Sequence, residues 1–333
     1  MAQQQTQLDP DEVRFFSGRS NRPLAQGIAN FLGVPLAKTH FGKYTNDTLH
    51  VQLGASVRGR AVYLVQSLVP PVSDNLLELL MMLDIARGAA ARQVHAIIPY
   101  FSYARSDKKD APRISITARL IADLLKEAGA THVMTMTLHS PQVHGFFSVP
   151  TDPLTARGLL AQYFHEQHIA DETTIMVAPD AGAAKTAGRL AGQLGLPVAT
   201  ALKTRTSDTK VRISDQIKRQ VEGYRRAIVH DDEIATGGTM AELCRMIVAA
   251  GIEEIYIACT HGLFLGTAPE RLAAVAEIKE IVTTDTVPLP PERRLPNMTI
   301  LSTAPVFGGA ILQNATRRSI GDLFTFWEGE EEE

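Results

Sequence analysis

The chain has 333 residues, 45% of them apolar and 21% charged, with a formal net charge of −3. This length corresponds to about two domains. The near-neutral charge excludes bulk nucleic-acid binding, and no apolar run is long enough to cross a membrane, so we expect neither partner. The first twelve residues lack the pattern of a targeting leader, and the cysteines are only Cys244 and Cys259. Together these features predict buried thiols in a cytoplasmic protein.

Short apolar segments alternate with helical patterns along the chain. Strands are predicted at residues 61–66, 94–99, 132–137, 174–178, 198–202, 227–229 and 255–259. Helices are predicted at residues 75–87, 116–128, 183–194, 240–250 and 270–276. This alternation indicates an α/β protein with two doubly wound, mainly parallel sheet domains.

The two halves of the chain carry similar series of elements, although no residue-level repeat is visible. The segment from Pro150 to Pro153 falls between them and suggests a boundary. We therefore expect an N-terminal domain over residues 13–152 and a C-terminal domain over residues 153–327. Residues 1–12 and the acidic residues 328–333 are expected to be disordered tails.

The strongest motif covers residues 227–240, which read AIVHDDEIATGGTM. A buried strand ends in Asp231 and Asp232, and a turn of small residues, 236–239, then opens a helix. Backbone N–H groups at such a helix start bind phosphate, and two carboxylates accept hydrogen bonds from sugar hydroxyls. The pattern predicts a site for a phosphorylated sugar. The alternative is an ordinary strand-to-helix turn with a solvated acidic pair.

Asp180 follows the strand at residues 174–178 and precedes Ala181-Gly182 at a second helix start. A carboxylate at this place can bind a magnesium–phosphate unit. The alternative role is that of a helix N-cap.

Two strand ends in the first half also carry polar motifs. Arg105 lies beside aromatic residues in a segment that ends with Asp107-Lys108-Lys109, and can hold a nucleotide triphosphate or stack on a base. His139 directly follows the strand at 132–137, where it can bind a metal or a phosphate. A solvated loop and a structural histidine are the respective alternatives.

Lys203 and Arg205 follow the short strand at residues 198–202 and precede a polar stretch. Two cations on a flexible hydrophilic loop suit a lid that neutralises charge on transferring phosphates. Ordinary surface cations are the alternative.

In this order, the motifs resemble those of the ribose-phosphate pyrophosphokinase family, from about Phe15 to Phe324. The resemblance implies the type I phosphoribosyltransferase fold in each half. It also implies transfer of the β,γ-diphosphoryl group of ATP to the 1-hydroxyl of ribose 5-phosphate, with Mg²⁺ as cofactor. Family members are homo-oligomers, commonly hexamers built from dimers.

The resemblance also assigns roles to individual residues. It implies catalytic roles for Lys203 and Arg205, and metal binding by His139 and Asp180. It implies ribose 5-phosphate binding by Asp231, Asp232, Ala235, Thr236, Gly237, Gly238 and Thr239. It implies ATP binding by Tyr44, Asn46, Asp47, Thr48, Arg105, Ser106 and Asp107.

This chain departs from the family pattern at several of these positions. Family members usually have Phe-Ser-Asp-Gly-Glu where residues 44–48 read Tyr-Thr-Asn-Asp-Thr, and an acid where Ala235 stands. The departures leave open a catalytically weak or inactive regulatory paralogue of a synthetase. A phosphoribosyltransferase is a third interpretation, but it would need a base-recognising segment that the sequence does not reveal.

Overall fold

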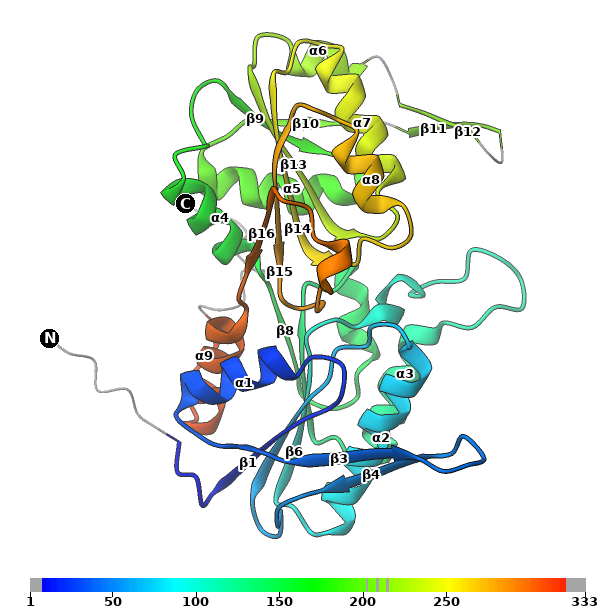
Figure 1. Cartoon of the computed structure of the whole chain (residues 1–333), viewed down its shortest axis with the longest axis vertical. Helices are drawn as coiled ribbons and strands as arrows, with labels where there is room; N and C mark the ends of the chain where they lie inside the picture. Colours follow the sequence, from blue (N-terminus) through cyan, green and yellow to red (C-terminus); the bar gives the residue numbers. More distant parts are fainter. Residues whose placement is uncertain (1–7, 202, 208–209, 214–215, 322–333) are drawn as a thin grey trace, which may run out of the picture. The chain divides into compact units, whose positions relative to one another are not determined.

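The computed structural model describes residues 8–201, 203–207, 210–213 and 216–321, and over residues 203–213 it describes the backbone alone. The chain forms two compact units (Figure 1). The first unit contains residues 1–155, 286–288 and those from Ser302 on, and the second contains residues 156–285 and 289–301. Within the described residues, no helix has both the length and the apolar character needed to cross a bilayer.

The first unit is built on a six-stranded parallel sheet with the strand order β2-β1-β5-β6-β7-β8. These strands are β1 (Val13–Ser17), β2 (Leu36–Ala37), β5 (Ala61–Val65), β6 (Gln93–Ile98), β7 (His132–Met136) and β8 (Thr151–Leu154). An antiparallel hairpin of β3 (Thr39–Lys43) and β4 (Leu49–Leu53) is inserted between β2 and β5 along the chain. All five residues of β5 are buried, as expected of a strand covered on both faces.

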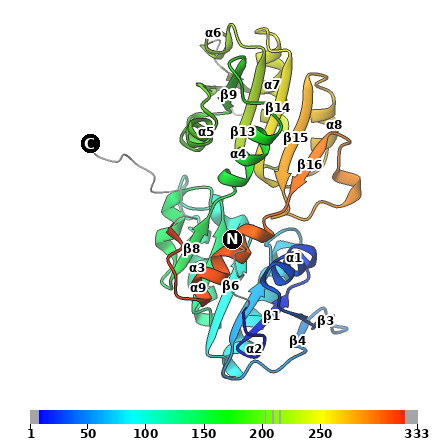
Figure 2. The same ribbon diagram turned by 90° about the vertical axis from the view of Figure 1, so that its left-hand side faces the viewer.

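Helices cover both faces of this sheet (Figures 1 and 2). The helices α2 (Val72–Gly88) and α3 (Thr117–Ala128) bury apolar residues such as Leu79 and Ile121 against one face. The helices α1 (Arg22–Leu32) and α9 (Ala304–Ala315) pack side by side although they are far apart in sequence. Gly308 allows this contact, because a Cβ atom there would lie 2.2 Å from Cδ1 of Phe31.

The second unit has a parallel sheet with the strand order β10-β9-β13-β14-β15-β16. These strands are β9 (Thr174–Ala178), β10 (Val198–Thr200), β13 (Arg226–Ile234), β14 (Glu254–Gly262), β15 (Ile278–Thr284) and β16 (Met298–Leu301). Apolar side chains of α4 (Arg157–Glu166) and α5 (Ala181–Leu194) pack on one face. Those of α6 (Gln216–Val221), α7 (Gly238–Val248) and α8 (Ala268–Ala273) pack on the other.

Both sheets follow one plan. When the six sheet strands of each unit are counted along the chain, each sheet has the order 2-1-3-4-5-6. Each unit also inserts an antiparallel hairpin between its second and third sheet strands, namely β3–β4 and β11 (Lys203–Ser207) with β12 (Lys210–Ile213). The prediction of two doubly wound parallel sheets is therefore confirmed, and the repeat extends to the hairpins.

The units differ from the expected sequential domains in two ways. Residues 151–154 form β8, which pairs with β7, so the expected boundary after residue 152 lies inside a strand of the first unit. Pro153 is tolerated there because β8 is an edge strand. Residues from Ser302 on return to the first unit because α9 packs on α1, whereas the sequence predicts that they belong to the second domain.

The N-terminal tail is shorter than expected. Leu8 is buried, and the N–H of Glu12 donates to the carbonyl oxygen of Asp9 in a turn that leads into β1. The expectation of disorder is therefore wrong for residues 8–12. Residues 1–7 and 328–333, the rest of the expected tails, lie outside the described residues.

Candidate active site

The acid pair Asp231 and Asp232 lies within β13, a central strand of the second unit. The parallel ladder to β14 continues past the pair to Ile234, and Asp231 stands in register with Cys259. The predicted strand end at residue 229 is therefore wrong, since backbone pairing does not stop where polar side chains begin. The pair is a polar segment of a buried strand and not the start of a loop.

The charge of each carboxylate is felt by the other. The backbone N–H of Asp232 donates to Oδ1 of Asp231 over 2.9 Å. Burial, followed by the neighbouring charge of Asp232, raises the pKa of Asp231 well above its usual range. The charge of Asp180 contributes to the same rise. Hydrogen-bond donors or positive charge from a bound ligand would relieve this repulsion.

Residues 235–237 connect β13 to α7, and Gly238 and Thr239 form the start of the helix. Gly237 has φ of +66°, which favours glycine, and a Cβ atom there would also lie 3.3 Å from Cβ of Ala268. No side chain caps the N-terminus of α7, so its first N–H groups and the helix dipole suit a bound anion. The loop follows the acid pair after two further residues of β13, Glu233 and Ile234.

Arg271 is a candidate site residue that sequence reasoning missed. Its Nη1 atom, on α8, donates to the carbonyl oxygen of Thr236 over 3.2 Å. It adds a positive charge beside the predicted phosphate loop. No local motif marks Arg271, because its position follows from the packing of α8 against α7.

Asp180 is the N-cap of α5. Its Oδ1 atom accepts a hydrogen bond from the N–H of Ala183 over 3.0 Å, so the alternative capping role is observed. The helix consequently begins at Ala181, two residues earlier than the sequence predicts. Asp180 also lies near the acid pair, because its charge contributes to the raised pKa of Asp231.

Lys203 and Arg205 lie on β11 of the second hairpin. Lys203 is in register with Ile213 of β12, and Arg205 with Val211. The backbone of this segment is thus a two-stranded ladder and not the irregular loop expected from its polar composition. The side chains of both residues lie outside the described part of the chain.

The turn of the β3–β4 hairpin brings together four predicted ATP-site residues, Tyr44, Asn46, Asp47 and Thr48. The N–H of Tyr44 donates to the carbonyl oxygen of Thr48, and Oδ1 of Asn46 accepts from the N–H of Thr48 over 3.2 Å. Oδ1 of Asp47 lies 3.0 Å from Nζ of Lys43. Tyr44 is 58% exposed and free to meet a ligand.

The second predicted ATP segment follows β6. Arg105 is exposed at the end of a short 3₁₀ helix, η1 (Ser102–Arg105). The Oγ atom of Ser106 accepts from the N–H of Thr117 over 3.2 Å and therefore supports the start of α3. Asp107 is half-buried in the following loop.

His139 is exposed just after β7 in the first unit, whereas Asp180 belongs to the second unit. Among the described residues, no group of three or more His, Cys, Asp or Glu side chains is arranged to hold a metal ion. The two predicted metal ligands, His139 and Asp180, are therefore not part of a preformed metal-binding cluster among the described residues.

The repeated sheet plan and the β13 loop define the class of protein, one that carries the phosphoribosyltransferase fold twice. Residues 13–129 match the model of the N-terminal domain of ribose phosphate pyrophosphokinase, and residues 154–288 match the phosphoribosyl transferase domain. The chain belongs to the ribose-phosphate pyrophosphokinase family.

Individual relatives match nearly the whole chain. A ribose-phosphate pyrophosphokinase of Deinococcus radiodurans is 46% identical over 93% of this chain and 97% of its own length. A putative ribose-phosphate pyrophosphokinase of Streptomyces coelicolor is 48% identical, with 94% and 98% covered. The crystal structure of phosphoribosylpyrophosphate synthetase from Mycobacterium smegmatis superposes with a TM-score of 0.85 at 36% identity, covering 92% of this chain and 99% of that one.

Proposed function

We propose that this chain is a ribose-phosphate diphosphokinase, which transfers the β,γ-diphosphoryl group of ATP to the 1-hydroxyl of ribose 5-phosphate. The products are phosphoribosyl pyrophosphate and AMP. Family membership over more than nine-tenths of the chain supports this activity. The observation that carries it is the half-buried pair Asp231–Asp232 at the end of β13, followed after a short loop by the uncapped N-terminus of α7.

In this proposal the second unit binds the sugar phosphate. Thr236, Gly237, Gly238 and Thr239 hold the 5-phosphate through backbone N–H groups and hydroxyls, and Ala235 adds only its backbone. Asp231 and Asp232 accept hydrogen bonds from ribose hydroxyls. The raised pKa of Asp231 supports this role, because a carboxylate crowded by other acids gains from donors that a ligand brings.

Enzymes that act on ATP generally need a metal, which we assign as Mg²⁺. The Asp180 carboxylate fits this ion, since Mg²⁺ is usually bound by one or two carboxylates together with substrate phosphates and water, and not by a full protein cage. Asp180 supplies such a carboxylate, and His139 would contribute the second protein group. When bound, the ion neutralises charge on the phosphate oxygens.

The nucleotide is assigned to the first unit. Its base and ribose are assigned to the hairpin turn, that is, to Tyr44, Asn46, Asp47 and Thr48. Its triphosphate is assigned to the segment after β6, that is, to Arg105, Ser106 and Asp107. We assign to Lys203 and Arg205 the role of stabilising the negative charge that develops on the transferred diphosphoryl group as the 1-hydroxyl attacks the β-phosphorus.

We further propose that the protein acts in the cytoplasm as a homo-oligomer, a hexamer built from dimers. Both cysteines, Cys244 and Cys259, are buried and unpaired, as in proteins of a reducing compartment.

The test is AMP formation by the purified protein from ATP and Mg²⁺, measured with and without ribose 5-phosphate. The proposal expects AMP only when the sugar phosphate is present. Binding of both ligands without turnover would contradict it and would favour a regulatory paralogue.

A further inference from the structure

Arg19 lies just after the carboxyl end of β1 in the first unit. It follows β1 by two residues, as Asp180 follows β9 by two residues in the second unit. Because the two sheets have the same strand order, these residues hold equivalent positions at the carboxyl ends of the strands. Ligands of doubly wound sheets bind at this edge.

A buried carboxylate holds the Arg19 side chain. Nη2 of Arg19 lies 2.9 Å from Oε1 of Glu78 on α2, and the Glu78 side chain is only 2% exposed. Burial raises the pKa of Glu78, while the charge and the backbone N–H of Arg19 oppose this rise. A buried carboxylate is expensive unless it is paired, so the contact fixes the guanidinium firmly.

Two further contacts fix the pair. Nε2 of Gln66 lies 3.4 Å from Oε2 of Glu78, and Oε1 of Gln66 accepts hydrogen bonds from the N–H and the hydroxyl of Ser20. The guanidinium carbon of Arg19 lies 5.2 Å from the ring centroid of Phe41, on β3 of the hairpin that carries the predicted ATP residues. Arg19 is thus held between α2 and this hairpin.

The remaining N–H groups of Arg19 are accessible, since its side chain is 51% exposed. Guanidinium is suited to phosphate recognition because its donors form a planar fork. Arg105 ends η1, which begins four residues after β6, and β6 lies two strands away from β1, or about 10 Å at the strand spacing of a sheet. A nucleoside triphosphate can span that distance.

We propose that Arg19 binds a phosphate group of the nucleoside triphosphate, and that Glu78 is the positioning residue that orients its guanidinium. This inference rests on the proposed function, because it assumes that the first unit binds ATP. It adds a second cation to the nucleotide side of the site, beyond Arg105.

The test compares the binding of ATP and of adenosine, which lacks phosphate, by calorimetry. Arg19→Gln should weaken ATP about 10- to 100-fold, the range for a hydrogen bond to a charged group, and leave adenosine unchanged. Arg22→Gln is the matched control, because Arg22 is an exposed arginine three residues further along the chain. This variant should bind ATP with wild-type affinity. Arg19→Lys should restore part of the loss.

The double variant Arg19→Gln/Glu78→Gln protects the test against misfolding, since it removes the charge that the single variant leaves buried without a partner. It should show the same selective loss of ATP affinity. Unchanged ATP affinity in the folded double variant, or an equal loss for ATP and adenosine, would overturn the inference. If the unaltered protein makes AMP with ribose 5-phosphate, such a result refutes the role of Arg19 and leaves the proposed function intact.

Discussion

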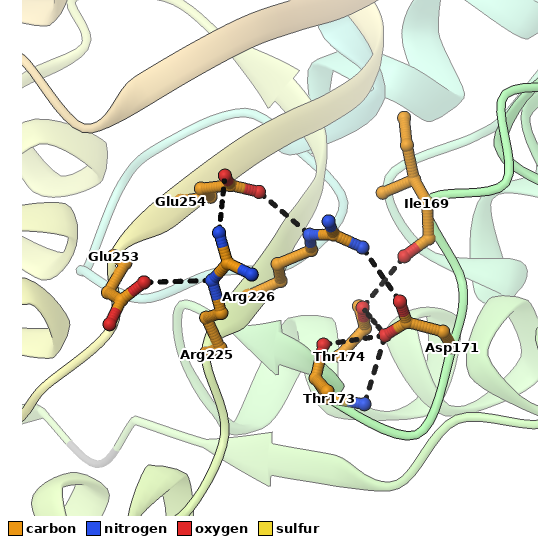
Figure 3. Close-up of polar contacts among 8 residues, drawn as sticks. All are labelled: Ile169, Asp171, Thr173, Thr174, Arg225, Arg226, Glu253 and Glu254. Atoms are coloured by element: carbon orange, nitrogen blue, oxygen red, sulfur yellow. Dashed lines mark hydrogen bonds and ion pairs between the residues drawn. The ribbon is translucent and has the colours of Figure 1, made fainter.

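Arg226 pairs with Glu254 across two neighbouring strands, with Nε of the arginine 2.7 Å from Oε2 of the carboxylate (Figure 3). Nη1 of the same arginine lies 2.7 Å from Oδ2 of Asp171, which precedes β9. One guanidinium therefore joins the amino ends of β9, β13 and β14, at the sheet edge opposite the candidate active site.

Replacing Arg226 should destabilise the fold without touching the site. Arg226→Met should lower the free energy of unfolding at pH 7 by about 1–2 kcal/mol, the sum of two partly exposed pairs, as measured by urea denaturation. Arg225→Met is the control, because the pairs of Arg225 are more exposed and should contribute less. An equal effect of both substitutions would contradict this account.

The contribution of Arg226 should also depend on pH. Hydrogen bonds from Thr173 and from Arg226 are the main causes that lower the pKa of Asp171 and Glu254, respectively. A carboxyl whose pKa is lowered by folding stabilises the protein above its unfolded pKa, about 4, and loses this effect as pH falls through its folded pKa. The stability difference between wild type and Arg226→Met should therefore shrink below about pH 4.

Asp231→Asn separates ligand binding from stability. Folding raises the pKa of Asp231, so its charged form opposes folding, and stability falls as pH rises from about 4 towards the folded pKa. The neutral variant should therefore melt higher than wild type at pH 7 without ligands, by about 2–4 °C for each kcal/mol gained. Its affinity for ribose 5-phosphate should fall by about 1.5–3 kcal/mol in calorimetry, with ATP affinity unchanged. Loss of ATP affinity instead would mean that the two sites are assigned in reverse.

The hairpin turn predicts weak discrimination among purine nucleoside triphosphates. Asn46 and Thr48 replace two acids of the family pattern with groups that also donate, and Oδ1 of Asn46 already accepts from the backbone of Thr48. The carboxylate of Asp47 pairs with Lys43, although its side chain is 84% exposed. The double change Asn46→Asp/Thr48→Glu should sharpen the preference for ATP by about 1 kcal/mol per recovered hydrogen bond. Competition of ATP against GTP measures this, and strict ATP use by the unaltered protein would refute it.

Lys203→Ala should lower turnover by about two to four powers of ten, as is typical when one charge-stabilising group is lost. Affinity for ribose 5-phosphate should change little, because the 5-phosphate is assigned to the loop after β13. Steady-state kinetics combined with calorimetry tests both parts. Turnover close to wild type would remove Lys203 from the catalytic role.

The sequence predicts six interior strands of the two sheets and the edge strand β10. It misses the interior strands β1 and β15, the other three edge strands and both hairpins. Strands such as β5 and β9 are continuous apolar runs, so their burial is evident from composition. The edge strand β8 contains Pro153, and the hairpin strand β11 is entirely polar, so neither has an apolar pattern that would mark it. Tertiary pairing decides these elements.

The residues of the candidate site also differ in how well the sequence predicts them. Asp180, Asp231 and the glycine turn are local motifs, and a strand followed by a helix start is readable from neighbouring residues. Arg271 and Arg19 are not, because their roles depend on contacts between α8 and the phosphate loop and between β1, α2 and β3. The sequence also does not predict that α9 belongs to the first unit, since this depends on the fit of Gly308 against Phe31.

In the proposed reaction, a diphosphoryl group moves as one unit from ATP to the sugar. One measurement follows ATP labelled with ¹⁸O at the non-bridging oxygens of both its β- and γ-phosphates during reaction with ribose 5-phosphate, using mass spectrometry of the products. The account predicts unlabelled AMP and an equal amount of phosphoribosyl pyrophosphate that carries both labels. Formation of ADP with a singly phosphorylated sugar, or release of labelled inorganic phosphate without a labelled sugar product, would contradict it.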